Sequence, residues 1–117
     1  MISGIHHFAV ISSSESSVQF YERLGFREIF RKERQYDTIV LMEGLGMRLE
    51  MFIDPNHPER AVNPENMGLR HLALKVDSIE ETAESLELIL GPVMKDWMGV
   101  RYAFIADPDG LPIELHE

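Results

Sequence analysis

Two similar stretches decide the fold: GIHHFAVIS at residues 4–12 and GLRHLALKV at residues 68–76. Each starts with a glycine and continues with alternating apolar side chains, a pattern that is typical of a buried β-strand. A histidine interrupts the pattern at the same place in both, at His7 and at His71, which lies 64 residues further along the chain. The same polar ring in the same strand context indicates a duplicated structural unit.

The offset of 64 residues also holds far from the two histidines. It aligns GLGMRLEMF, from residue 44, with PDGLPIELH, from residue 108, and thereby aligns Glu50 with Glu114. Each glutamate therefore follows the histidine of its own half by 43 residues. We conclude that one unit occurs twice.

Each half has the pattern β-α-β-β-β, so the expected fold class is α+β with two βαβββ modules. Helical spacing of apolar residues follows each opening strand, and Ser13 and Asp77 are the expected N-caps, with Glu80 at the capping-box distance from Asp77. The further strands are expected at residues 26–33, 37–42, 47–53, 92–97, 101–106 and 111–116. DPDG at residues 107–110 predicts a hairpin turn in which the glycine has a positive φ.

The length of 117 residues predicts a single domain, 1–117. Module 1 covers residues 1–53 and module 2 covers residues 68–117. The segment between them, DPNHPERAVNPENM at residues 54–67, is rich in Pro and Asn and has no periodicity, so it is predicted to be a linker.

The composition excludes several classes of partner. A net charge of −9 opposes binding to nucleic acid or to an anionic membrane. No apolar run is long enough to span a membrane, and the first residues do not resemble a secretory signal, so we expect a cytoplasmic protein. With no cysteine, the chain has neither a thiol nucleophile nor a thiolate ligand.

Four polar residues are expected on the sheet faces that point away from the helices. Side chains alternate along a strand, and the apolar residues at 47, 49, 51 and 53 must face the helix, which turns Glu50 to the other side. The same argument applies to Glu114 and the two histidines. A carboxylate on such a half-buried face is destabilising unless it is paired or binds a cation. Two imidazoles and two carboxylates around the space left by small alanines are suited to a divalent metal ion.

Structural interpretations compete with this one. A single strand histidine is commonly a hydrogen-bonded structural residue, and His6 is expected on the helix side in that role. His57 and His116 are expected to be exposed, with an approach to a substrate as the alternative. Arg48 and Arg101 are expected to form salt bridges, with anion binding as the alternative. Trp97, Met94 and Met98 are expected in the core or at an interface.

With these residues in place, the chain resembles the vicinal-oxygen-chelate superfamily, and within it the small bacterial glyoxalase I-like proteins, which are related to lactoylglutathione lyase. The segments that carry the resemblance are IHHFAVI, SVQFYERLGF, MRLEMF, GLRHLALKVDSI and ADPDGLPIEL. The resemblance implies a cupped mixed sheet around one divalent metal ion, and a homodimer. The implied ligands are His7, Glu50, His71 and Glu114, with the paired modules either in one chain or exchanged between two.

The same resemblance implies a metal-dependent lyase or isomerase. Its substrate would be a small α-hydroxy carbonyl compound or a hemithioacetal, reacting through an enediolate that the ion stabilises. Glu114 is the implied catalytic base, and Glu50 is the ligand that shares this role. Two open coordination positions suit Ni, Co, Mn or Fe, and Zn is also compatible.

Two departures from the glutathione-using enzymes stand out. Those enzymes typically have an arginine four residues after the first ligand and an asparagine four residues after the first glutamate, whereas this chain has Ile11 and Asp54. A different carbonyl or hydroxy-acid substrate is therefore equally compatible. An extradiol-type dioxygenase and a non-catalytic small-molecule-binding or resistance module are the alternative functions.

Overall fold

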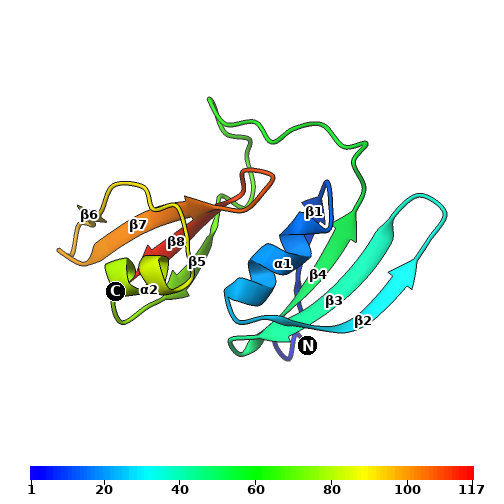
Figure 1. Cartoon of the computed structure of the whole chain (residues 1–117), viewed down its shortest axis with the longest axis horizontal. Helices are drawn as coiled ribbons and strands as arrows, with labels where there is room; N and C mark the ends of the chain where they lie inside the picture. Colours follow the sequence, from blue (N-terminus) through cyan, green and yellow to red (C-terminus); the bar gives the residue numbers. More distant parts are fainter. The chain divides into compact units, whose positions relative to one another are not determined.

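The computed structural model describes all residues from 1 to 117, which fold as two units, Met1–Pro58 and Glu59–Glu117 (Figure 1). The boundary between them falls inside the segment predicted as a linker. Residues 54–67 contain no helix and no β-strand, apart from an isolated β-bridge between Val62 and Glu65. None of the helices is long and apolar enough to cross a membrane.

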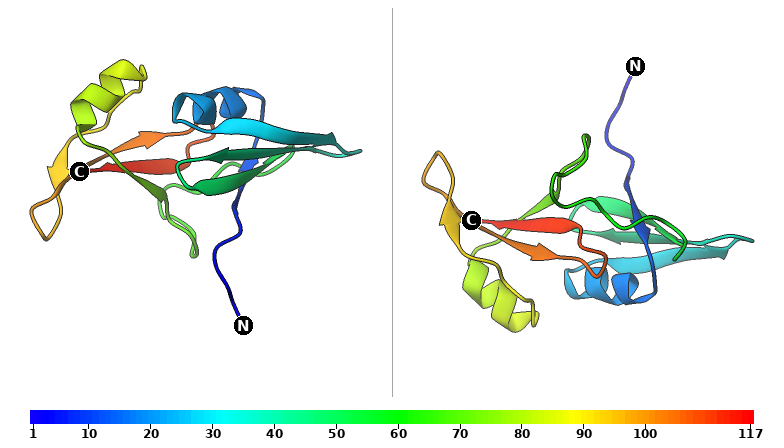
Figure 2. Two further views of the ribbon diagram at one scale, coloured as in Figure 1. Left: turned by 90° about the horizontal axis from the view of Figure 1, so that it is seen from below. Right: turned by 90° about the horizontal axis from the view of Figure 1, so that it is seen from above.

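The first unit is a four-stranded mixed sheet with one helix. Its elements are β1 (Phe8–Ser12), α1 (Ser16–Arg23), β2 (Arg27–Glu33), β3 (Thr38–Gly44) and β4 (Met47–Ile53). The strand order is β1-β4-β3-β2, with β1 parallel to β4 and the other pairs antiparallel. Helix α1 lies on one face of this sheet, and the first residues of the chain leave on the other side (Figure 2).

The second unit repeats this topology. Its elements are β5 (Leu72–Lys75), α2 (Ile79–Ser85), β6 (Met94–Lys95), β7 (Arg101–Ala106) and β8 (Pro112–His116). The order is β5-β8-β7-β6, again with a parallel first pair and antiparallel neighbours. The prediction of an α+β fold with two βαβββ modules is thus confirmed.

Alternation along the strands builds the core of each unit. In the first, Met42, Leu49 and Met51 are fully buried beneath the equally buried Tyr21 of α1. In the second, Ile113 and Leu115 of β8 and Ile105 of β7 take the corresponding places, together with the buried Ile79 of α2. The residues between these positions belong to the opposite faces, which is where the candidate site residues lie.

Element boundaries differ from the prediction where several residues compete for the same role. Helix α1 begins after Glu15, which makes no side-chain cap, and not after Ser13. Helix α2 is capped by Ser78, whose hydroxyl accepts a hydrogen bond from the Glu81 amide, and not by Asp77. Strand β6 is only two residues long, because the chain around it turns back at Asp96.

The DPDG turn between β7 and β8 forms as predicted. Gly110 has a φ of 87°, and its amide donates to the carbonyl oxygen of Asp107. The buried Asp107 carboxylate accepts hydrogen bonds from the amides of Asp109 and Leu111. This side chain therefore fixes the register with which β8 enters the sheet.

Gly44 provides a test of the packing of the first unit. A Cβ atom at this position would lie 2.3 Å from the Gly25 carbonyl oxygen and 2.9 Å from Phe26 Cα. Because both neighbours are backbone, Gly44→Ala should lower the free energy of unfolding by about 1–3 kcal/mol. Gly4→Ala is the control, since nothing lies within 4 Å of its added methyl group. Equal denaturation midpoints for the two variants would contradict this packing.

Candidate metal centre

The first unit brings one histidine and one glutamate into direct contact. His7 precedes β1, and its Nε2 atom lies 3.0 Å from Oε2 of Glu50. Glu50 sits in the middle of β4, flanked by Ala9 on β1 and Leu41 on β3. The small Ala9 therefore lies beside the carboxylate, and the space expected there stays a prediction.

His6 contacts His7 rather than the helix. The Nδ1 atoms of the two rings are 2.8 Å apart, so one ring donates a hydrogen bond to the other. The expected placement of the exposed His6 on the helix side is therefore wrong, whereas its structural role stays a prediction. The prediction failed because β1 starts at Phe8, so strand alternation does not extend back to His6.

The second unit repeats this register. Glu114 on β8 lies between Ala73 on β5 and Phe104 on β7. His71 precedes β5, and its ring meets Phe104 edge to face at a centroid distance of 5.1 Å. The Nδ1 atom of His71 is buried and has no hydrogen-bond partner.

The unpartnered ring nitrogen tests whether these residues suit a metal ion. A buried polar atom without a partner is destabilising, so structural histidines normally have both ring nitrogens satisfied. A histidine that donates a lone pair to a cation has no such requirement. The donor set of two imidazoles and two carboxylates also matches a divalent first-row metal. On both grounds the residues fit.

Neither unit by itself gathers three or more His, Asp or Glu side chains that could hold an ion. Each supplies one histidine and one glutamate: His7 and Glu50 in the first, His71 and Glu114 in the second. The four-ligand centre therefore stays a prediction that needs both units.

His116 lies beside Glu114 on the same face of β8. Its Nδ1 atom is 3.4 Å from Oε2 of Glu114, and its Nε2 atom is 3.9 Å from Oδ2 of Asp96. The His116 side chain is 35% exposed, so it is less exposed than the sequence predicted. His57 is more exposed and lies 3.5 Å from Oδ2 of Asp54.

The arginines expected in salt bridges do form them. Arg48 contacts Glu43 at 3.4 Å, and Arg101 contacts both Glu80 and Glu117. The core alternative for these three side chains, Trp97, Met94 and Met98, is wrong, because 92% of Trp97 is exposed in the turn between β6 and β7 and Met94 and Met98 are also exposed. A position at an interface stays a prediction. All three residues lie in or just after β6, a two-residue strand at the edge of the sheet.

Arg34 and Asp37 form a pair that the sequence did not reveal. They close the β2–β3 hairpin, and Nε and Nη2 of Arg34 each donate to one carboxylate oxygen of Asp37 at 2.6 Å. Arg34 Cζ lies 4.8 Å from the Tyr36 ring centroid and 5.8 Å from that of Phe52. The only sequence signal is an opposite charge three residues away, which is too common to single out.

The Arg34–Asp37 pair predicts part of the acid sensitivity of the fold. Hydrogen bonds from Arg34 hold the pKa of Asp37 below its ordinary value. A lowered folded-state pKa stabilises the protein above the unfolded-state pKa of about 4, and this contribution disappears as the pH falls through the folded-state value. Denaturation midpoints of Asp37→Asn should therefore fall less between pH 7 and pH 3 than those of the unmodified protein. Glu59→Gln, which removes an exposed carboxylate, should leave that pH dependence unchanged.

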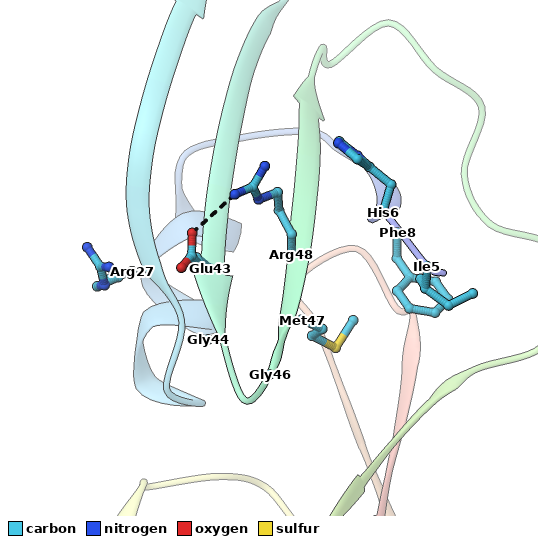
Figure 3. A pocket seen from close by; sticks show the side chains of 9 residues that line it. All are labelled: Ile5, His6, Phe8, Arg27, Glu43, Gly44, Gly46, Met47 and Arg48. Carbon is cyan, nitrogen blue, oxygen red and sulfur yellow. Dashed lines mark hydrogen bonds and ion pairs between the residues drawn. The ribbon is translucent and has the colours of Figure 1, made fainter. Parts of the chain in front are cut away.

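A shallow hollow opens near the start of β1 in the first unit (Figure 3). Figure 3 shows Arg48 directed toward Glu43, with Arg27 on β2 and His6 before β1. Its complete lining is Ile5, His6, Phe8, Arg27, Glu43, Gly44, Gly46, Met47 and Arg48. None of the four predicted ligands belongs to it, although His6 links it to His7.

The chain is similar to known proteins over its whole length. The family model of the Glyoxalase/Bleomycin resistance protein/Dioxygenase superfamily matches residues 4–115. The uncharacterized protein YwkD of Bacillus subtilis (strain 168) is 38% identical over 126 residues, covering 100% of this chain and 98% of YwkD. The crystal structure of the glyoxalase family protein from Enterococcus faecalis has a TM-score of 0.89 and 36% identity, with 97% of both chains covered.

A more distant structure shares the fold alone. It is a mutant of FosX, the fosfomycin resistance protein of Listeria monocytogenes, complexed with Mn(II) and 1S,2S-dihydroxypropylphosphonic acid. Its TM-score is 0.73 at 21% identity, covering 99% of this chain and 93% of that one.

Proposed function

We propose a function from the premise that this chain belongs to the Glyoxalase/Bleomycin resistance protein/Dioxygenase superfamily, whose model matches residues 4–115. It is a metal-dependent lyase or isomerase that acts on a small α-hydroxy carbonyl compound or hemithioacetal. It works in the cytoplasm as a homodimer. The observation that carries the proposal is the repeated register of the strands. In each unit the glutamate is paired with an alanine, and that alanine follows the histidine of the same unit by two residues.

His7, Glu50, His71 and Glu114 would hold one divalent ion, Ni, Co, Mn, Fe or Zn. The ion would act as a Lewis acid that stabilises negative charge on two neighbouring substrate oxygens. The two paired modules would come from one chain or from two chains of the dimer.

The side chains around the ion have separate tasks. Glu114, which lies beside the small Ala73 on the neighbouring strand, takes the proton from the substrate carbon and returns it to the adjacent carbon. Glu50 would share this role from the other unit. His116 contacts Glu114 and limits the directions in which its carboxylate can turn.

Two measurements on the unmodified protein test this function. Metal analysis after purification should find about one divalent ion for each four-ligand site. The protein loaded with Ni or Co should then exchange the carbon-bound proton of at least one α-hydroxy carbonyl compound with deuterium from D2O, measured by NMR. The hemithioacetal of methylglyoxal and glutathione should be included in the panel.

The outcomes separate the candidate functions. Bound metal without any proton exchange would favour a binding or resistance module. Oxygen consumption with a catechol by the Fe(II) form would favour a dioxygenase. The absence of any bound metal after loading would remove the proposal altogether.

A further inference from the structure

The Arg34–Asp37 pair lies on the same side of the first sheet as Glu50. Phe52, which contacts Arg34, follows Glu50 by two residues on β4, so the two side chains share a face. Glu50 and Phe52 are about 7 Å apart along β4, and the Arg34 guanidinium lies over the Phe52 ring. The pKa of Arg34 is raised mainly by its hydrogen bonds to Asp37, and the charge of Glu50 adds to the effect.

The guanidinium of Arg34 is held in one orientation. Two hydrogen bonds fix it to Asp37, whose side chain is only 8% exposed. The rings of Tyr36 and Phe52 further restrict it. A side chain fixed in this way loses little entropy when it binds a ligand.

The fixed guanidinium keeps donors for a ligand. An arginine has five N–H groups, and the two bonds to Asp37 use two of them. Of the remaining three, one on Nη1 and one on Nη2 are parallel and can bind a carboxylate or phosphate group through two hydrogen bonds. Arg48, in contrast, has one long contact of 3.4 Å to Glu43 and is not held on two sides.

We propose that Arg34 binds an oxyanion, a carboxylate or a phosphate, at the end of the substrate that is remote from the metal-chelating oxygens. This inference rests on the proposed function and narrows its substrate class. The substrate would be an α-hydroxy carbonyl or α-hydroxy acid with a second, anionic group. Asp37 is a positioning residue, because it acts on the ligand only through Arg34.

Calorimetry on the Ni-loaded protein with matched probes tests the proposal. Lactate and malate differ by a second carboxylate, and glycerate and 3-phosphoglycerate differ by a phosphate. We expect the longer member of at least one pair to bind about tenfold or more tightly than its parent. A preference in the first pair identifies a carboxylate site and a preference in the second a phosphate site.

Variants assign this preference to Arg34. Arg34→Gln should abolish it while leaving lactate affinity within about twofold. The double variant Arg34→Gln with Asp37→Asn avoids leaving a buried carboxylate unpaired and should behave in the same way. Arg31→Gln is the matched control, because Arg31 pairs with Glu15 and Glu28 and lies opposite the buried Val40, on the helix side. No preference in the unmodified protein, or a preference that survives in the double variant, would overturn the inference.

A measurement on metal-free protein tests the anion site of Arg34 independently of the proposed lyase function. The guanidinium N–H resonances of Arg34, assigned through their loss in Arg34→Lys, should shift when malate or 3-phosphoglycerate is added to metal-free protein and not when the uncharged glycerol is added. Failure of metal binding with this shift present would remove the lyase function and keep the anion site. Metal binding with no shift and no preference would remove the anion site alone.

Discussion

Glu114→Gln should slow proton exchange at the substrate carbon by about 100- to 10,000-fold at saturating metal. This is the range that a general base contributes, and a glutamine amide cannot accept the proton. Glutamine keeps an oxygen that can still coordinate an ion, so the variant should regain metal at higher concentration. The measurement is deuterium incorporation by NMR with Ni- or Co-loaded protein.

The repeat provides the comparison for Glu114→Gln. Glu50 occupies the equivalent place in the first unit, between Ala9 and Leu41, and already contacts His7 at 3.0 Å. Glu50→Gln should weaken metal binding but reduce proton exchange less than Glu114→Gln once the site is saturated. Equal losses in the two variants would show that both carboxylates move the proton. A Glu114→Gln variant of unchanged rate would show that Glu114 is not the base.

The sequence predicted the parts of the fold that depend on periodicity. The offset of 64 residues, found first at the two histidines, recurs in the structure as an identical register, with Ala9 beside Glu50 and Ala73 beside Glu114. Alternation along β4 and β8 was enough to place both glutamates on the face opposite the core. The DPDG turn was predictable because its geometry depends on neighbouring residues alone.

Features that depend on competition between neighbours were not predictable to the same degree. The serines at positions 13, 14 and 16 have similar capping ability, so the sequence did not decide where α1 begins. His6 was misplaced because strand alternation was assumed to continue toward the N-terminus beyond Phe8, the first residue of β1. The Arg34–Asp37 pair depends on the register of the β2–β3 hairpin and on Phe52, which is far away in sequence.

His71→Gln should lower the affinity for Ni or Co by at least about 100-fold. Changes to residues that only support a ligand already reduce metal affinity by about 10- to 100-fold, and removal of the ligand itself should exceed this. The structural reason is the buried Nδ1 atom, which has no hydrogen-bond partner. A structural histidine would normally use this atom in a hydrogen bond. Titration with a competing chelator measures the affinity.

The same substitution distinguishes a metal ligand from a structural residue through stability. In the metal-free state, His71→Gln should change the free energy of unfolding little, because no hydrogen bond of the ring nitrogen Nδ1 is lost. Added metal should raise the melting temperature of the unmodified protein, because a ligand that binds the folded state stabilises that state. The increase should be much smaller for the variant. His57→Gln, in the exposed segment beside Asp54, should respond to metal as the unmodified protein does. A His71→Gln variant that unfolds readily without metal yet binds the ion normally would make the ring a packing element against Phe104, and the metal centre would lose one of its four ligands.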